Sequence, residues 1–340
     1  MMHRVKFGSL LALGLLGRWL FCILIVSATA LLVSAQVPVP TFQFASIDCP
    51  GATLSRATGI NSEGQIVGRY IVGSTFHGFL LSQGTYSSID VPGASYTIAH
   101  GINDAGQIVG RYADARGVVH GFLLSEGAFT TINFPDAIYT GVTQINSRGD
   151  IAGTYIDAGG AQHGFSLTEG SFRTIDFPGA TFSEAIGINA KGEIIGVYSF
   201  VTRLETANNN HGFVLKDGEF TSIDVPGAAS TFAWKINEHG QIVGCWTDTN
   251  GLVRGFLQSS QGSFVTVEFP GTTYSYASAI NEAGAIVGTY IDAGGTTHGY
   301  LATRTRPEAS SHEQDLRFRV VGDLILMTGK PNNRSLPAVR

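Results

Sequence analysis

INSEGQIVGRY, residues 60–70, recurs in similar form along most of the chain and so indicates the architecture. Each copy opens with an Ile-Asn pair, followed by a turn and an apolar strand that contains Gly. The asparagines of these pairs are Asn61, Asn103, Asn146, Asn189, Asn237 and Asn281. Their spacings of 42, 43, 43, 48 and 44 residues define six repeats, and a period of this length indicates a repeat architecture.

Each repeat is predicted to be a meander of four strands. Strand one runs into Ile-Asn, strand two follows the pattern Gln-Ile-Val-Gly-x-Tyr, strand three begins with His-Gly-Phe, and strand four ends in Asp-x-Pro. Alternating apolar residues and Gly-bearing turns support all four strands. Six such meanders are typical of a β-propeller. We therefore predict an all-β fold, a six-bladed β-propeller of four-stranded antiparallel blades, over residues 36–303.

The phase of the repeat predicts how the ring closes. The sixth repeat ends near Ala302 and has no strand four after it, whereas residues 42–50 at the other end of the chain match that strand. We expect this N-terminal strand to complete blade six and to close the ring, which would leave no unpaired edge there. An open solenoid of six units is the alternative.

Composition and charge agree with this fold and exclude one class of function. The chain has 44 Gly in 340 residues and only 14% charged residues, whereas ordinary soluble proteins carry about 25%. Many Gly and few charges favour strands joined by tight turns. Residues 36–303 hold 11 basic and 22 acidic residues, a net charge of −11. A protein that binds nucleic acid needs the opposite sign, so no nucleic-acid partner is expected.

The two ends of the chain lie outside the repeats. Residues 1–35 are predicted to be a signal peptide, because a basic start precedes an apolar run at 19–33 and small residues precede Gln36. Cleavage would make the protein secreted, periplasmic or cell-surface, with no membrane association; an uncleaved anchor is the alternative. Residues 304–340 are predicted to be a loosely structured tail, in which 316–327 could add a strand.

These motifs resemble a known family. The Ile-Asn, Gly-x-Ile-Val-Gly and His-x-Phe patterns over residues 42–303 are similar to those of the bacterial extracellular HAF-repeat family. That family has His-Ala-Phe where this chain has Gly at the middle position. The resemblance implies export and a repeated β architecture, and it implies neither a reaction nor a ligand.

The repeated His is predicted to be structural. Two-residue turns join strands three and four, and such a turn pairs positions of constant sum, so His77 should face Asp90. The same arithmetic, with ring closure for the last, pairs His120 with Asn133, His163 with Asp176, His211 with Asp224, Arg254 with Glu268 and His298 with Asp48. Where His becomes the longer Arg, Asp becomes the longer Glu, as a cross-strand pair requires. Metal ligation is the alternative, but zinc needs three or four converging ligands.

Other repeated features are also assigned to the scaffold. Asp-x-x-Gly motifs such as that at Asp114 predict turns capped by the Asp, with calcium sites as the alternative. Trp246 occupies a repeated Tyr position and is predicted to pack in the core. Cys49 and Cys245 lie at different repeat positions and are predicted to be buried, unbridged thiols. No cofactor or metal is expected.

A ligand is expected where the repeats differ from one another. First-strand positions at the predicted channel mouth vary between repeats, and an insertion at 200–210 lies on the same face. The predicted ligand-binding residues are Glu184, Arg203, Phe232, Trp234 and Lys235. Aromatic faces with charged and amide neighbours suit a glycan or a peptide. The alternative is that these side chains only plug the channel.

These observations favour a secreted, non-catalytic binding or interaction protein. A glycan-active hydrolase or lyase is the first alternative; it would need two nearby carboxylates, for which the sequence offers Glu184 and Asp136. The Gly-x-Ser-x-Gly, His-Glu-x-x-His and phosphate-loop motifs are missing from the sequence. A structural envelope or matrix protein is the further alternative. The pattern does not determine the oligomeric state.

Overall fold

The computed structural model describes residues 40–201, 209–305, 317–321 and 324–328, and all of its named elements are strands. The first repeat forms an antiparallel meander of β2 (Leu54–Ile60), β3 (Ile66–Val72), β4 (Thr75–Ser82) and β5 (Thr85–Ile89). The second forms β6 (Tyr96–Ile102), β7 (Ile108–Ala113), β8 (Val119–Ser125) and β9 (Ala128–Ile132). The third forms β10 (Tyr139–Ile145), β11 (Ile151–Ile156), β12 (Gln162–Thr168) and β13 (Ser171–Ile175). The fourth forms β14 (Phe182–Ile188), β15 (Ile194–Ser199), β16 (His211–Lys216) and β17 (Glu219–Ile223), and the fifth β18 (Ser230–Ile236), β19 (Ile242–Thr247), β20 (Val253–Gln258) and β21 (Phe264–Val267).

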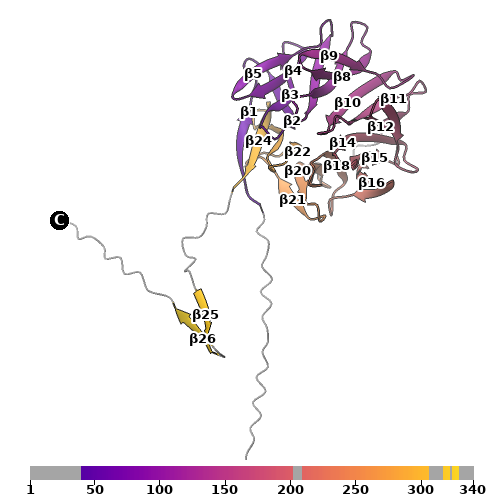
Figure 1. Cartoon of the computed structure of the whole chain (residues 1–340). Helices are drawn as coiled ribbons and strands as arrows, with labels where there is room; N and C mark the ends of the chain where they lie inside the picture. The colour runs from indigo at the N-terminus through magenta and orange to yellow at the C-terminus, as the bar shows by residue number, and fades with distance from the viewer. Residues whose placement is uncertain (1–39, 202–208, 306–316, 322–323, 329–340) are drawn as a thin grey trace, which may run out of the picture. The chain divides into compact units, whose positions relative to one another are not determined.

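The sixth repeat takes its fourth strand from the N-terminal side of the chain. Its own strands are β22 (Ser275–Ile280), β23 (Ile286–Ile291) and β24 (Thr297–Arg304). The edge of β24 pairs antiparallel with β1 (Phe42–Ile47), from Phe42 opposite Arg304 to Ile47 opposite Gly299. Figure 1 shows β1, in indigo, alongside β24. This is the partner that the phase of the repeat predicts for that segment.

The first strands of the six repeats contact one another in chain order. β2 contacts β6, and the series continues through β10, β14 and β18 to β22, which contacts β2 again. Figure 1 shows β2, β14, β18 and β22 near the middle of the folded body, with β5, β9 and β21 toward its outside. The first strand of each meander is therefore the inner one.

Six asparagine side chains link the repeats by a closed cycle of hydrogen bonds. Asn61 Nδ2 donates to the carbonyl oxygen of Asn103 at 3.2 Å, and the same bond recurs from each repeat to the next. The last bond runs from Asn281 Nδ2 to the carbonyl oxygen of Asn61, at 3.0 Å. The intermediate donors are Asn103, Asn146, Asn189 and Asn237. All six asparagines are buried, so each bond satisfies a carbonyl that water does not reach.

The turns between strands three and four set the register of each meander. Gln83 and Gly84 have φ values of 49° and 77°, and two positive φ values in succession are what a two-residue type I′ turn requires. The equivalent Glu126, Glu169 and Asp217 also have positive φ, each followed by Gly. In the fifth repeat one extra residue follows Ser259, as the longer sequence there predicts.

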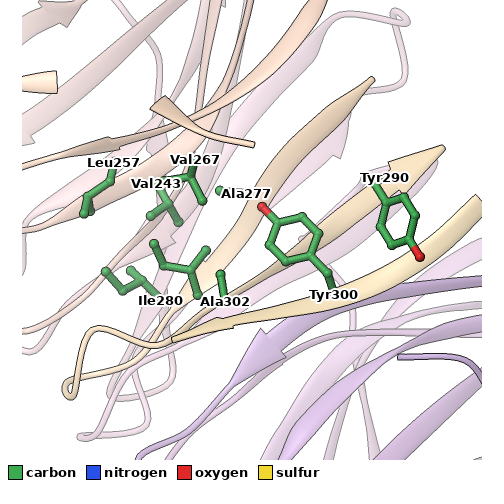
Figure 2. Packing of buried hydrophobic residues seen from close by; sticks show 9 residues of the cluster. Val243, Leu257, Val267, Ala277, Ile280, Tyr290, Tyr300 and Ala302 are labelled. Atoms are coloured by element: carbon green, nitrogen blue, oxygen red, sulfur yellow. The ribbon is translucent and has the colours of Figure 1, made fainter. Parts of the chain in front are cut away.

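Aromatic side chains from strand three fill the space between neighbouring sheets. The fully buried set is Phe79, Phe122, Phe165, Phe213, Phe256 and Tyr300. Each ring passes over a Gly of strand two; a Cβ at Gly68 would lie 2.6 Å from Cε1 of Phe79. Figure 2 shows one such cluster, in which the fifth and sixth repeats contribute Val243, Leu257, Val267, Ala277, Ile280 and Tyr300. The core is thus divided into layers between sheets.

The two ends of the chain add little to this description. The predicted signal peptide, residues 1–35, lies outside the described residues. In the stretch predicted to be a tail, β25 (Arg317–Val321) pairs antiparallel with β26 (Leu324–Thr328).

The contact between β1 and β24 includes a histidine held between two carboxylates. His298 Nδ1 lies 2.8 Å from Asp48 Oδ1, and Nε2 lies 3.2 Å from Asp292 Oδ2. Partial burial opposes protonation of this ring, but the hydrogen bonds and charges of Asp48 and Asp292 outweigh it and raise the pKa of His298.

We expect the stability contributed by His298 to depend on pH. Because its pKa is raised in the folded protein, the contribution is complete below the ordinary His value of about 6.5 and is lost as the pH rises through the folded-state value. Urea unfolding of the wild type and His298→Gln should therefore differ more at about pH 5.5 than at about pH 8.5. Equal differences at both pH values would contradict this role.

Candidate functional site

A β-bulge in every first strand brings an additional side chain to the middle of the fold. In β18 the register shifts between Ala233 and Lys235, at Trp234. Neighbours on a regular strand point to opposite faces, whereas a bulge lets Trp234 and Lys235 line the same space. The other bulges lie at Thr58, His100, Thr143, Ile186 and Ser278. The bulges thus lie at a position that varies between the repeats.

All six first strands line one cavity of about 300 Å³, called the inner cavity below. Two second strands, β3 and β7, also reach it. The lining residues are Arg56, Thr58, Arg69, His100, Arg111, Thr143, Glu184, Ile186, Phe232, Trp234, Lys235, Tyr276 and Ser278. Several of these side chains are only half-buried, so solvent reaches the cavity.

The inner cavity has a cationic side and an aromatic side. The first and second repeats supply Arg56, Arg69 and Arg111, whereas the fifth and sixth supply Phe232, Trp234 and Tyr276. The rings of Trp234 and Tyr276 lie 4.8 Å apart, centroid to centroid, at 55°. Arg56 Nη1 donates to the Tyr276 hydroxyl at 3.2 Å and joins the two sides.

The structure brings four of the five predicted ligand-binding residues to this cavity. Glu184, Phe232 and Trp234 are half-buried at its wall, and Lys235 is buried with 7% of its surface exposed. The fifth, Arg203, lies outside the described residues.

Two cavity residues lie on strands that the sequence analysis assigned to the scaffold. Arg69 on β3 and Arg111 on β7 occupy one repeat position of strand two. The other repeats have Thr154, Val197, Cys245 and Thr289 there. A charged residue that replaces small or apolar ones at a repeated position is the signal that would have identified both.

Electrostatics at the inner cavity are dominated by positive charge. Burial lowers the pKa of Lys235 to about 7. Burial also holds the pKa of His100 well below 6.5, and the charges of Arg111, Arg69 and Lys235 add to that effect. The pKa of Arg69 falls to about 10 through burial and the neighbouring charge of Arg56. Burial is thus the main cause of all three shifts, and neighbouring positive charges add to it at His100 and Arg69.

A second cavity, of about 360 Å³, shares Arg111, Thr143 and Glu184 with the inner cavity and so adjoins it. Its lining adds Tyr96 and Tyr139. The Tyr139 hydroxyl accepts from Arg111 Nη1 at 3.0 Å.

The two carboxylates of the hydrolase alternative are not brought together at either cavity. Glu184 lines both cavities, and its Oε1 accepts from Gln162 Nε2. Asp136 belongs to neither lining; it is an exposed turn residue with a φ of 59°. It stands where the other repeats have Gly, because the turn requires the left-handed region.

Two long side chains cross the middle of the fold below the inner cavity. Lys235 Nζ donates to the carbonyl oxygen of Thr143. Gln144 donates from Nε2 to the carbonyl oxygen of Ile236 at 3.2 Å and accepts at Oε1 from the Ile188 amide at 3.1 Å. Lys235 and Gln144 thus connect the third repeat to the fourth and fifth.

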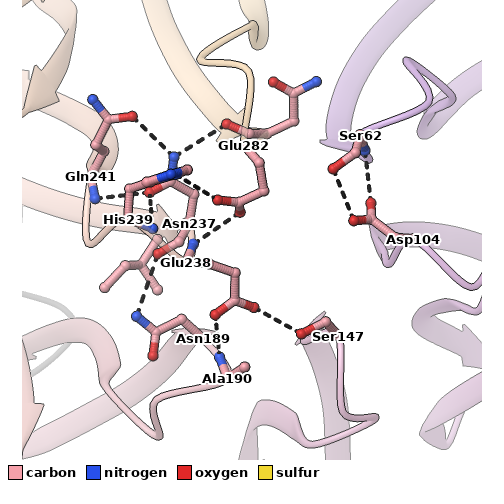
Figure 3. A network of polar contacts seen from close by, with 12 residues as sticks. Ser62, Asp104, Ser147, Asn189, Ala190, Asn237, Glu238, His239, Gln241 and Glu282 are labelled. Carbon is pink, nitrogen blue, oxygen red and sulfur yellow. Dashed lines mark hydrogen bonds and ion pairs between the residues drawn. The ribbon is translucent and has the colours of Figure 1, made fainter.

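At the opposite end, carboxylates bond to the turns of neighbouring repeats. A cavity of about 70 Å³ lies there, next to the asparagine cycle. Asp104 accepts from the amide and hydroxyl of Ser62 at 2.8 and 2.9 Å. Glu238 accepts from the Ala190 amide at 2.7 Å, and Glu282 from the Glu238 amide at 2.9 Å (Figure 3). These carboxylates therefore belong to the scaffold.

The repeated His and acid residues lie as cross-strand pairs. His77 Nδ1 is 2.9 Å from Asp90 Oδ1, and Arg254 Nη1 donates to Glu268 Oε2 at 2.8 Å. The remaining contacts, at 2.8 to 2.9 Å, join His120 to Asn133, His163 to Asp176, His211 to Asp224 and His298 to Asp48. A strand-two Tyr packs on the ring, as Tyr70 does on His77. The histidines are thus enclosed on two sides by their own sheet.

The remaining scaffold residues also have local partners. Asp114 Oδ1 accepts from the amides of Arg116 and Val118 and so caps its own turn. Cys49 and Cys245 are buried and unbridged, and Trp246 packs beside the cluster of the fifth repeat. Within residues 40–201 and 209–305, the structure holds no group of three or more His, Cys, Asp or Glu residues placed to bind a metal ion.

The described part of the chain contains no helix with the length and apolar character needed to cross a membrane.

Comparison with known proteins places the fold. No protein-family model matches the sequence, and no curated protein matches it. The structure is similar to that of putative TolB from Agrobacterium tumefaciens, at 13% identity over 79% of this chain and 99% of that chain, with a TM-score of 0.50. It is also similar to virginiamycin B lyase from Staphylococcus aureus (12% identity, 76% and 88% covered, TM-score 0.42). A mutant Aleuria aurantia lectin in complex with α-methyl-L-fucoside gives 12% identity, coverage of 79% and 96%, and a TM-score of 0.44. Identities this low bear on the fold alone, and the chain has a propeller-like all-β fold built from four-stranded antiparallel sheets.

We expect Lys235→Met to stabilise the protein near neutral pH. Burial costs the ammonium its hydration, and Met fills a similar volume without charge, so the free energy of unfolding should rise by about 1–4 kcal/mol at about pH 6.5. The unfolded chain binds the Lys proton up to about pH 10.4, whereas the folded chain releases it near pH 7. The free energy of unfolding of the wild type therefore rises relative to that of the variant as the pH increases.

Urea unfolding of both proteins at about pH 6.5 and about pH 10 measures this difference. A variant that is less stable than the wild type at the lower pH would show that the ammonium is held by favourable contacts, against the prediction.

Proposed function

We propose that this protein is a secreted, non-catalytic binding protein that recognises a glycan or a peptide at the inner cavity. The observation that carries the proposal is the composition of that cavity. Half-buried aromatic faces stand next to guanidinium, hydroxyl and carboxylate groups, in a space of about 300 Å³. Such combinations of flat apolar surface and a few directed polar groups are typical of small-ligand sites.

The scaffold of this site is proposed to be a closed six-bladed β-propeller. Three features support closure: the pairing of β1 with β24, the contact of β22 with β2, and the asparagine cycle that returns from Asn281 to Asn61. Each first strand contributes to one cavity, which agrees with blades arranged around a common axis.

Export and family membership are part of the same proposal. The basic and apolar pattern of residues 1–35 supports a cleaved signal peptide, and the repeated motifs support membership of the HAF-repeat family. In the proposed compartment, outside the cytoplasm, the inner cavity would meet envelope or extracellular ligands.

Binding is proposed rather than catalysis because of the carboxylates. Glu184 is the one acidic residue among those that line the inner cavity, and Asp136 lies away from it. Glycoside hydrolysis by the common mechanisms needs two carboxylates about 5–9.5 Å apart.

We expect Trp234→Ala to abolish or strongly weaken ligand retention on an array of glycans and peptides. The substitution removes one of the three aromatic side chains of the inner cavity while leaving the scaffold pairs intact. Trp246→Phe is the matched control, because Trp246 lies at the repeated Tyr position, and it should bind as the wild type does.

Two outcomes would speak against the proposal. Unchanged retention by Trp234→Ala on every array ligand would show that the inner cavity is not the site. A product formed by the wild type and lost in Glu184→Gln would favour the hydrolase or lyase alternative.

A further inference from the structure

The inner cavity concentrates positive charge in a strongly acidic part of the chain. Residues 36–303 have twice as many acidic as basic residues, 22 against 11. Four of those 11 basic residues, Arg56, Arg69, Arg111 and Lys235, line this one cavity, together with a single carboxylate, Glu184. Basic side chains distributed at random in such an acidic region would form ion pairs with Asp or Glu.

These cations do not meet acidic partners. Among the described residues none of the four forms an ion pair, whereas Arg148, Lys216 and Arg254 elsewhere in the fold do. The Nε atoms of Arg56, Arg69 and Arg111 are buried and have no hydrogen-bond partner in the described part of the chain. An unpaired buried donor on a charged group is costly, and three such donors belong to side chains that line this one cavity.

The arrangement of the cations is also unfavourable. Arg56 and Arg69 are direct cross-strand neighbours on β2 and β3. Like charges at opposed positions destabilise a sheet, and the equivalent pairs in other repeats, such as Phe232 with Cys245, avoid this. A guanidinium stays charged in either case, so an anion between the two groups would relieve the repulsion.

We propose that the inner cavity binds the carboxylate of an acidic sugar, a glycan unit that carries both a carboxylate and ring hydroxyls. Arg56, Arg69 and Arg111 hold the carboxylate, since a guanidinium and a carboxylate can form two parallel hydrogen bonds. Phe232, Trp234 and Tyr276 pack against the apolar face of the sugar ring. This inference rests on the proposed binding function and names the ligand class.

A sugar acid fits the rest of the lining better than an acidic peptide does. A peptide brings a row of amide N–H donors, for which the described lining offers one carboxylate, Glu184. Sugar hydroxyls both donate and accept, so they can accept from the guanidinium groups and donate to Glu184. The Thr58 and Thr143 hydroxyls already donate to backbone carbonyl oxygens and are left to act as acceptors. The Ser278 hydroxyl is buried and has no partner among the described residues.

The test is calorimetric titration of the purified protein with uronic acid tetrasaccharides, namely those of galacturonate, glucuronate and mannuronate. We expect at least one to bind, and its methyl ester, which is neutral but of similar shape, to bind about tenfold or more weakly. Arg69→Met and Arg111→Met should each weaken binding of the free acid by about tenfold or more. Arg173→Met, at an exposed position on β13, is the matched control and should leave binding unchanged.

Folding of the variants is checked by urea unfolding. Arg69→Met removes a like-charge neighbour of Arg56, so its unfolding midpoint should equal or exceed that of the wild type. Equal binding of acid and ester would overturn the acidic-sugar inference while leaving glycan recognition in place. Failure of all three acids, or arginine-dependent binding of tetraglutamate in their place, would also overturn it. Failure of every glycan and peptide on the array would remove the proposed function itself.

Discussion

Each buried asparagine amide holds two turns at once, and the arrangement of the repeats depends on this double contact. Asn61 Oδ1 accepts from the Gln65 amide at 2.9 Å and fixes its own turn, while Nδ2 donates to the carbonyl oxygen of the next asparagine. An amide can do this because it carries a donor and an acceptor on one planar group. The six bonds, of 3.0 to 3.4 Å, run from each repeat to the next and return from the sixth to the first.

The polar groups that recur in the repeats make contacts within the scaffold. Hairpin turns hold His77 against Asp90, and acidic turn residues such as Asp104 accept hydrogen bonds from the preceding repeat. Binding chemistry is then left to side chains that differ between repeats. The bulge in each first strand directs those side chains into the inner cavity, since it places Trp234 and Lys235 on the same side of β18.

Two features of the inner cavity lower the stability of the fold. Arg56 on β2 lies opposite Arg69 on the adjacent strand β3, and Lys235 is buried with a pKa lowered to about 7. Neither feature helps the chain to fold, because each places positive charge where water and counter-charges are scarce. Local violations of the packing rules of this kind concentrate at functional sites, and here they lie together at the inner cavity.

Several features can be predicted from the order of residues alone: the repeat, the four strands of each unit, the cross-strand partners and the strand at 42–47 that pairs with β24. These features follow from short-range rules: strands alternate, turns need Gly, and a hairpin pairs positions of constant sum. The cycle of asparagines and the presence of Arg69 and Arg111 at the inner cavity become visible only in the folded chain. Both depend on distances between repeats, which no single repeat encodes. Asp136 and Glu184 belong to neighbouring units in the sequence, which made them a possible pair. In the structure only Glu184 lines the inner cavity, and Asp136 is exposed.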